Sequence, residues 1–313
     1  MIILIEPKRE AGFTSGGYRY QSSVFGQLSP DQGRIVTATA DGLHALVGCL
    51  RLQNPDALIV VDGLFAELSS RPLPGECVAL LHMVPTRLEW CEQPMHVVTT
   101  GAATAASVAS GSLSTAVVRP GIDVCFDQPR SARLPGAAIQ VVCVGTVSAS
   151  KGQVRLVRIL ESISAQWRLA LIGSSDPNSG EVALLHEASA GLPVDLIGAV
   201  SIEQVADRFA SADLLVSLSQ SESFGMSVAE AAAAGLPVLA LSAGEIDDFI
   251  EHDQNGWILP GDAADDHIKA CLSDLLLAPG KLAAAKSARR RPSLASWEGV
   301  AKSFVQACMA TQS

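Results

Sequence analysis

The chain has 313 residues, of which 48% are hydrophobic and 17% are charged, and its formal net charge is −10. The length fits two medium-sized domains, and the hydrophobic content argues against a disordered chain. The negative charge argues against a general nucleic-acid binder, because neutralising phosphates takes a basic face.

Cysteine usage and the apolar segments predict a soluble cytoplasmic protein. The seven cysteines are widely spaced and form no CxxC pair, which favours buried thiols over a disulfide framework or a zinc site. The opening run MIILIE is shorter than the core of a secretory signal. Residues 96–118 carry no charge apart from a protonated His96, but Ala, Ser, Thr and Gly dominate them. We therefore expect membrane contact to be peripheral at most.

Short apolar runs along the chain predict buried strands. The first half contains MIILIE, ALIVVDG, CVALLH, HVVTT and TAVVRPG, and the second contains IQVVCVG, RLALIG, VDLIGAV, ADLLVSLS, LPVLAL and GWILPG. Their apolar residues are continuous rather than alternating, which is typical of parallel strands covered on both faces. Helical patterns separate the runs, so the predicted fold class is α/β with two Rossmann-like parallel-sheet domains.

A polar segment without periodicity, residues 125–137, is interpreted as the interdomain linker. The predicted domains are therefore residues 1–127 and 137–295, facing each other across a cleft that would hold the ligand. The last segment, 296–313, has apolar residues at helical spacing and is predicted to be an amphipathic helix. We expect this helix to pack near or back onto the first domain.

Several common enzyme signatures are missing. No GxGxxG follows a predicted strand, and neither HExxH nor GxSxG occurs. The loop GTVSASKGQ at 145–153 lacks the Gly-Lys-Ser/Thr ending of a nucleotide-binding P-loop. These absences disfavour a nicotinamide or flavin dehydrogenase, a metalloprotease, an α/β-hydrolase and a P-loop NTPase.

The stretch SQSESFGMSVAEAAAAGLPVLA at 219–240 carries two glutamates eight positions apart. Glu222 falls in a predicted strand-to-helix loop, and Glu230 falls about two turns into the predicted helix. Backbone N–H groups at that helix start favour an anion, here those of Phe224, Gly225 and Met226. The carboxylates could accept hydrogen bonds from ligand hydroxyls. Spacing alone favours a plainer interpretation, in which Glu222 caps the helix and Glu230 is solvated.

This stretch resembles the E-x7-E region of retaining glycosyltransferases of family 4, which have the GT-B fold. Further segments resemble the same family in the same order: GG at Gly16 and Gly17, LLHMVPT, VVRPGIDVCFDQP, VVCVGTVSASKGQ, HDQNGWILPGDA and SWEGVAKSF. The resemblance covers nearly the whole chain, and it is strong over residues 141–262 and weaker before 118.

The resemblance implies a role for each matching residue. Glu230 would hold the ribose hydroxyls of a nucleotide sugar, Glu222 would contact the donor sugar, and Lys151 would neutralise the diphosphate. The N–H groups of the helix start, those of Phe224, Gly225 and Met226, would face the sugar or the β-phosphate.

Other implied roles fall on the remaining loops. Gly16 and Gly17 would complete the phosphate and acceptor side, and the nucleotide base would lie near Gly173 and Val200. His82 would contact the sugar, although a histidine after an apolar strand is also often a packed core residue.

Two departures from the family pattern stand out. Thr146 follows Gly145 where the family usually has an arginine, which removes a bidentate cation from the diphosphate site. Arg155 or Arg158 could replace it, but the solvated interpretation is favoured for both. The first domain is also shorter than is usual in the family.

The resulting prediction is a retaining glycosyltransferase that uses a nucleotide-diphosphate sugar, with no obligatory cofactor or metal. Its acceptor is undetermined and could be a saccharide, a lipid-linked group or a small molecule. Alternatives are a catalytically inactive nucleotide-sugar-binding or scaffold relative and another GT-B enzyme, such as an epimerase or a phosphorylase.

Overall fold

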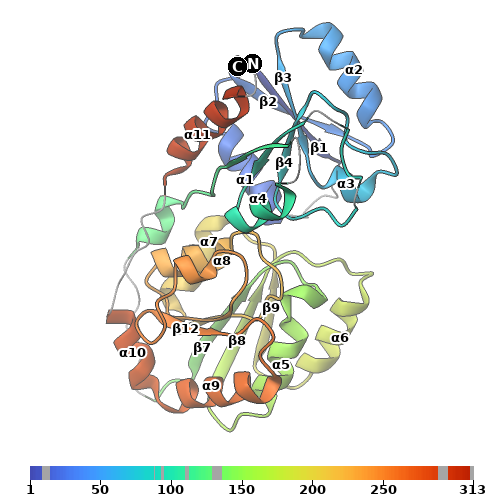
Figure 1. Cartoon of the computed structure of the whole chain (residues 1–313). Coiled ribbons are helices and arrows are strands. Elements are labelled where there is room, and N and C mark those ends of the chain that lie inside the picture. The colour runs from blue at the N-terminus through green and yellow to red at the C-terminus, as the bar shows by residue number, and fades with distance from the viewer. Residues whose placement is uncertain are drawn as a thin grey trace. The chain divides into compact units, whose positions relative to one another are not determined.

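The computed structural model describes residues 1–8, 15–87, 89–92, 95–109, 113–128, 136–287 and 295–310. They divide into two compact units (Figure 1). Of the described residues, the first unit holds 1–8, those from Gly16 to Gly121 and those from Ala295 onward, and the second holds Ser15 and those from Ile122 to 287. Residues 122–127, which the sequence interpretation assigned to the first domain, therefore group with the second unit.

The first unit is built on a parallel sheet with the strand order β2-β1-β3-β4-β5-β6. Its elements are β1 (Ile2–Pro7), α1 (Gly16–Phe25), β2 (Gly33–Ala38), α2 (Leu43–Gln53), β3 (Leu58–Asp62), α3 (Phe65–Leu68), β4 (Val78–Leu81), β5 (His96–Thr99), α4 (Ala102–Val108), β6 (Ser114–Val117) and α11 (Trp297–Met309). Every residue of β1, β4 and β5 is buried, as the continuous apolar runs predicted.

One strand of this sheet, β2, was not predicted. It is an edge strand, and only its first residue, Gly33, is buried. A strand covered on both faces needs a continuous apolar run, but an edge strand does not, so GRIVTA carries a weak signal.

The C-terminal helix α11 packs against α1 within the first unit (Figure 1). The contact is aromatic, because the ring of Tyr20 lies edge-on to Trp297 at 5.9 Å and to Phe304 at 6.4 Å. Phe25 adds a second edge-on contact to Phe304 at 5.9 Å. Edge-to-face pairs at these distances add to the stabilisation from apolar burial, so α11 fixes the position of α1.

The second unit is built on a parallel sheet with the strand order β12-β11-β10-β7-β8-β9. Its elements, with η for a 3-10 helix, are η1 (Val124–Asp127), β7 (Ile139–Val144), η2 (Ala149–Lys151), α5 (Gln153–Glu161), β8 (Trp167–Ile172), α6 (Gly180–Ser189), β9 (Val194–Gly198), α7 (Ile202–Ser211), β10 (Leu214–Ser217), α8 (Met226–Ala233), β11 (Val238–Leu241), η3 (Ile246–Asp248), β12 (Gly256–Leu259), α9 (Asp265–Leu277) and α10 (Pro279–Ser287).

Helices cover both faces of this second sheet (Figure 1). Each face has its own hydrophobic core. Successive residues of a strand point to opposite faces, so Val141 and Cys143 of β7 join the core under α5 and α9. Val142 joins the core under α7 and α8. Because both faces are covered, the loops at the strand ends are left to carry the polar chemistry.

Candidate functional site

The loops after β7 and β10 meet at the switch point of the second sheet. β10 pairs with β7, while the chain runs from β7 to β8 on one side and from β10 to β11 on the other. Open α/β sheets bind ligands at such a point, outside the carboxyl ends of the strands. Here Lys151 Nζ donates a hydrogen bond to Glu222 Oε1, and 29% and 15% of the two side chains are exposed.

Backbone contacts lock the two loops together. Gly152 has φ +71°, and a Cβ at this position would lie 2.9 Å from the Leu218 carbonyl oxygen. Only glycine combines this left-handed conformation with so close an approach. In the next turn, the Gln220 N–H donates to the Ser150 carbonyl at 2.8 Å. Glycine at 152 therefore serves the contact between the loops, which brings Lys151 to Glu222.

The start of α8 presents backbone donors beside this ion pair. Gly225 is its N-cap, with φ +88°, and a Cβ there would lie 2.8 Å from Ile246 Cγ1. Within the described residues, no hydrogen bond is recorded for the N–H groups of Phe224, Gly225 and Met226. The Phe224 ring is buried against Phe249, so only its backbone is available to a ligand. The result is a set of N–H groups suited to an anion.

The plainer interpretation of the two glutamates is wrong for both. Glu222 does not cap α8, because the N-cap is Gly225 and no side-chain cap is formed. Glu230 is 1% exposed rather than solvated. Burying a carboxylate within a core helix costs free energy unless other groups compensate its charge. The preference of glutamate for helices therefore does not by itself explain why position 230 is a glutamate.

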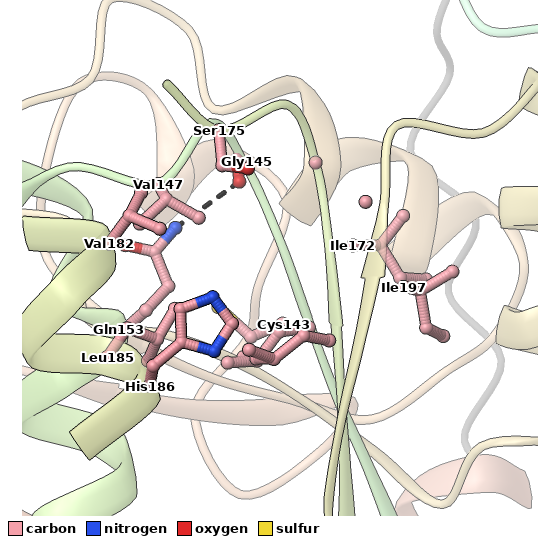
Figure 2. A pocket seen from close by; sticks show the side chains of 14 residues that line it. Cys143, Gly145, Val147, Gln153, Ile172, Ser175, Val182, Leu185, His186 and Ile197 are labelled. Carbon is pink, nitrogen blue, oxygen red and sulfur yellow. Dashed lines mark hydrogen bonds between the residues drawn. The ribbon is translucent and has the colours of Figure 1, made fainter. Parts of the chain in front are cut away.

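A pocket of about 220 Å³ lies where β7, β8 and β9 end beneath α6 (Figure 2). Figure 2 shows Val182, Leu185 and His186 of α6 on one side of it and Ile172 and Ile197 on the other. Its lining is mostly apolar, with backbone and a few polar groups at the rim, which is typical of small-molecule sites.

The pocket contains one of the two residues near which the resemblance placed the nucleotide base. Gly173 lines it, with φ +151°, and a Cβ there would approach the Gly145 carbonyl oxygen to 2.1 Å. Val200 is absent from the lining and packs on the core that also contains Phe209.

Sequence reasoning missed Gln153, which shapes the loop after β7. Its buried amide Nε2 donates to the Gly145 carbonyl at 3.2 Å (Figure 2). It also donates to the Thr146 carbonyl at 3.1 Å. The Thr146 hydroxyl lies 3.2 Å from the hydroxyl of Ser174. A glutamine directly after the Gly-containing loop was the available signal, but glutamine is common at helix starts.

Of the two arginines considered as substitutes for a cation at Thr146, Arg155 is held by other partners. Arg155 Nε donates to Asp265 Oδ1 at 2.6 Å, and its Nη2 donates to the Ala263 carbonyl at 2.6 Å. Arg155 is thus tied to the start of α9 and not simply solvated, whereas Arg158 is exposed. In the described part of the chain, Lys151 is the predicted diphosphate contact that lies at the switch point.

Gly16 and Gly17 are the first residues of α1 in the first unit. A Cβ at Gly17 would lie 2.8 Å from His82 Cδ2, so glycine here lets the helix approach the imidazole. Gly17 therefore has a packing role in this structure. The predicted contact of both glycines with a ligand stays a prediction.

His82 follows β4 and is half-buried in a polar group of the first unit. Its Nε2 lies 3.3 Å from Gln21 Nε2, and its ring is edge-on to Tyr20 at 5.4 Å. Gln21 Nε2 also donates to Asp62 Oδ2 at 2.6 Å. Burial lowers the pKa of His82 to about 4 and raises the pKa of Asp62. His82 is therefore a neutral imidazole at neutral pH.

Within the described ranges, no cluster of three or more His, Cys, Asp or Glu side chains is arranged to hold a metal ion. None of the helices in the described part of the chain combines the length and the apolar character needed to cross a membrane.

Residues 126–291 match the family model described as glycosyl transferases group 1. This stretch is just over half of the chain. A sulfoquinovosyl transferase of Arabidopsis thaliana is 32% identical over 129 residues, covering 40% of this chain and 24% of that protein. A D-inositol 3-phosphate glycosyltransferase of Rhodococcus erythropolis is 30% identical over 208 residues, covering 61% of this chain and 47% of that protein. The match spans less than half the length of each of these curated relatives.

Solved structures resemble the whole chain. A sucrose-phosphate synthase of Thermosynechococcus elongatus has a TM-score of 0.77 at 18% identity and covers 99% of this chain and 98% of its own. HepE of Anabaena, solved with UDP and glucose, has a TM-score of 0.76 at 16% identity over 99% of both chains. At these identities the likeness shows the fold. The predicted fold class, GT-B with two Rossmann-like parallel sheets, is confirmed.

Proposed function

Because the chain belongs to the glycosyl transferases group 1 family, we propose that it transfers a sugar from a nucleotide-diphosphate sugar to an acceptor hydroxyl. We further propose that the transfer retains the configuration of the anomeric carbon, as the resemblance to family 4 implies. The acceptor class is left open among a saccharide, a lipid-linked group and a small molecule.

The observation that carries the proposal is the meeting of Lys151, Glu222 and the start of α8 at the switch point of the second sheet. A diphosphate needs positive charge and N–H donors, and a sugar needs acceptors for its hydroxyls. Lys151 and the α8 start supply the first set, and Glu222 supplies the second. Glu230, on the same helix, is proposed to bind the ribose hydroxyls.

In the proposed reaction, the bond between the anomeric carbon and the diphosphate breaks while positive charge develops on the sugar. Negative charge develops on the leaving diphosphate at the same time. The N–H groups of residues 224–226 belong to the backbone and keep their direction as this charge develops, and Lys151, once it has exchanged Glu222 for the phosphates, adds a positive charge beside them. The acceptor oxygen bonds to the anomeric carbon on the face that the diphosphate leaves, and a departing phosphate oxygen takes the acceptor proton, so no separate protein base is required.

The pocket under α6 is proposed to take part of the nucleotide, because it opens beside Gly173 and the loop that carries Lys151. HepE, a structural relative at 16% identity, was solved with UDP, which makes UDP the first nucleotide to test. The role of His82 as a contact of the sugar stays a prediction.

The test is a thermal-shift series with UDP, GDP, ADP and TDP. Binding to the native state raises the melting temperature by mass action, and a ligand at one hundred times its Kd stabilises by about 2.7 kcal/mol. We expect one nucleotide to stabilise the wild type and the shift to vanish in Glu230→Gln, which keeps the side-chain shape.

The matched control is Glu187→Gln, which makes the same change at an exposed position of α6. It should keep the wild-type shift. No shift with any of the four nucleotides, or an unchanged shift in Glu230→Gln, would count against the proposed donor site.

Retention is tested separately by following the anomer of the first product by NMR. The inactive alternative has one observation in its favour, the neutral Thr146 paired with Ser174 where a cation is expected. Slow release of free sugar from the donor without acceptor would argue against inactivity, provided that the release is lost in Glu222→Gln.

A further inference from the structure

A second polar group lies at the switch point of the other sheet. In the first unit, β1 pairs with both β2 and β3, and the chain leaves β1 toward β2 and β3 toward β4. Asp62 ends β3, Gln21 lies on the helix that follows β1, and His82 follows β4. Three elements far apart in the sequence thus bring an acid, an amide and an imidazole together where an open α/β sheet binds ligands.

The hydrogen bonds of this group all have N–H donors that point toward Asp62 or His82. Two N–H groups point at the Asp62 carboxylate: Gln21 Nε2 at 2.6 Å from Oδ2 and the Leu64 backbone at 2.9 Å from Oδ1. An ionised carboxylate only accepts, so Asp62 takes the NH₂ end of the Gln21 amide. The second hydrogen of that NH₂ group is then available for His82 Nε2, 3.3 Å away.

Gln21 keeps this orientation at a cost. The residue is fully buried, and its carbonyl Oε1 is among the buried oxygens for which no hydrogen bond is found in the described residues. A buried acceptor without a donor is unfavourable, and an apolar side chain of similar size would avoid that cost. A purely packing role therefore does not account for an amide at position 21, whereas the two bonds from its NH₂ group do.

We propose that Asp62 and Gln21 are positioning residues that hold His82 as a neutral imidazole with its proton on Nδ1. Asp62 orients the Gln21 amide, and the amide donates to Nε2, which must then be the bare nitrogen. The proposal concerns the state of His82; its use in sugar transfer rests on the proposed function.

The remaining surroundings of His82 leave the Nδ1 edge for a ligand. The Cδ2 edge lies against Gly17, whose absent Cβ would be 2.8 Å from it, and Tyr20 contacts the ring edge-on. Among the described residues, the structure records Gln21 as the hydrogen-bond partner of this ring and none for Nδ1. His82 would therefore offer an N–H donor to an oxygen of the bound sugar, and it would not act as a base through Nδ1.

The test is the tautomer of His82, read from the ¹⁵N shifts of its two ring nitrogens in histidine-labelled full-length protein. His82→Gln identifies the signals. A protonated and a bare nitrogen resonate far apart, so the two tautomers are distinguished directly. We expect the wild type to carry the proton on Nδ1 at neutral pH.

Two variants at position 21 alter the hydrogen bond to His82 in different ways. In Gln21→Glu the new carboxyl shares a proton with the Asp62 carboxylate beside it, so its oxygen facing His82 can only accept and the histidine proton should move to Nε2. Gln21→Met removes the bond altogether, and the ring should return to the mixture of an unconstrained imidazole, in which Nε2–H is favoured. Gln27→Glu, the same substitution at an exposed position just after α1, should leave the tautomer unchanged.

A wild-type proton on Nε2 would overturn the proposal, as would the same tautomer in the wild type, Gln21→Glu and Gln21→Met. The tautomer measurement needs neither the sugar donor nor the sugar acceptor of the proposed reaction. It therefore tests the state of His82 independently of the proposed transferase activity. If transfer is observed, Gln21→Glu should lower kcat at least tenfold and leave the melting-temperature shift with nucleotide unchanged.

Discussion

Lys151 and Glu222, 71 positions apart, form an ion pair across the carboxyl ends of β7 and β10. The pair neutralises the cation that is proposed to meet the diphosphate. A nucleotide that binds Lys151 must therefore compete with Glu222 for it, and the two substitutions should have opposite effects on binding.

Glu222→Gln is expected to preserve or strengthen the binding of a nucleoside diphosphate while sugar transfer falls. Removing the carboxylate frees Lys151 for the phosphates but takes away an acceptor for sugar hydroxyls. Lys151→Met should weaken the same binding by about 10- to 150-fold, the equivalent of a charge-assisted hydrogen bond worth about 1.5–3 kcal/mol. Titration calorimetry measures both changes.

Lys302→Met is the matched control, because Lys302 forms an exposed ion pair with Glu298 on α11. It should alter neither binding nor transfer. Equal weakening of nucleotide binding by Glu222→Gln and Lys151→Met would contradict the competition.

Gly17→Ala is expected to destabilise the protein and shift the ring of His82. The added Cβ would lie 2.8 Å from Cδ2, a distance that real side chains do not tolerate, so the imidazole or α1 must move. Gly48→Ala, in the middle of α2, meets nothing within 4 Å and should stabilise by about 0.5–1 kcal/mol through helix propensity. Denaturant unfolding of the two variants measures the contrast, and equal effects would show that the contact at Gly17 relaxes freely.

Gly225→Ala is expected to cost at least about 1–2 kcal/mol, because φ +88° is a left-handed conformation that a Cβ disfavours. The new Cβ would also lie 2.8 Å from Ile246 Cγ1. Gly180→Ala at the start of α6 meets nothing within 4 Å and serves as the control for the same change. If the two variants unfold at the same denaturant concentration, the backbone at 225 is not strained by a side chain.

Acidification is expected to destabilise the wild type through His82. Burial lowers its pKa from 6.5 to about 4, so the unfolded chain binds more protons between these values. The stabilisation is full above about pH 6.5 and is lost as pH falls toward 4, by at most about 3.4 kcal/mol at about 1.36 kcal/mol per pH unit. Asp62, whose pKa is raised, acts in the opposite direction, and Tyr20 titrates well above this range.

Subtracting the His82→Gln variant isolates this contribution, because Asp62 and Tyr20 remain in both proteins. Urea unfolding at about pH 7 and about pH 5 should show a larger loss for the wild type than for the variant. Parallel losses in the two proteins would mean that the pKa of His82 is the same in the folded and unfolded states, so that burial does not lower it.

The sequence by itself determined the fold class and the second-unit motif. A parallel strand covered on both faces must be apolar along its whole length, so runs such as IQVVCVG reveal their strands locally. The positions of Glu222 and Glu230 relative to α8 follow from the same local pattern, since a strand, a glycine and an Ala-rich run are contiguous in the chain. Local patterns do not show whether a charged residue on a helix is buried. The spacing therefore favoured a solvated Glu230, whereas this residue is 1% exposed in the structure.

Only the tertiary structure decided which distant side chains meet. Gln21, Asp62 and His82 come from three elements whose neighbours are set by sheet order, and nothing in the spacing of these residues encodes that order. The sequence favoured a solvated Arg155 because only its own helix could be considered. Its hydrogen-bond partners lie about 110 positions away at the start of α9. Periodicity reports on the faces of single elements. The pairing of elements is fixed by packing the whole core, and it decides which groups share a site.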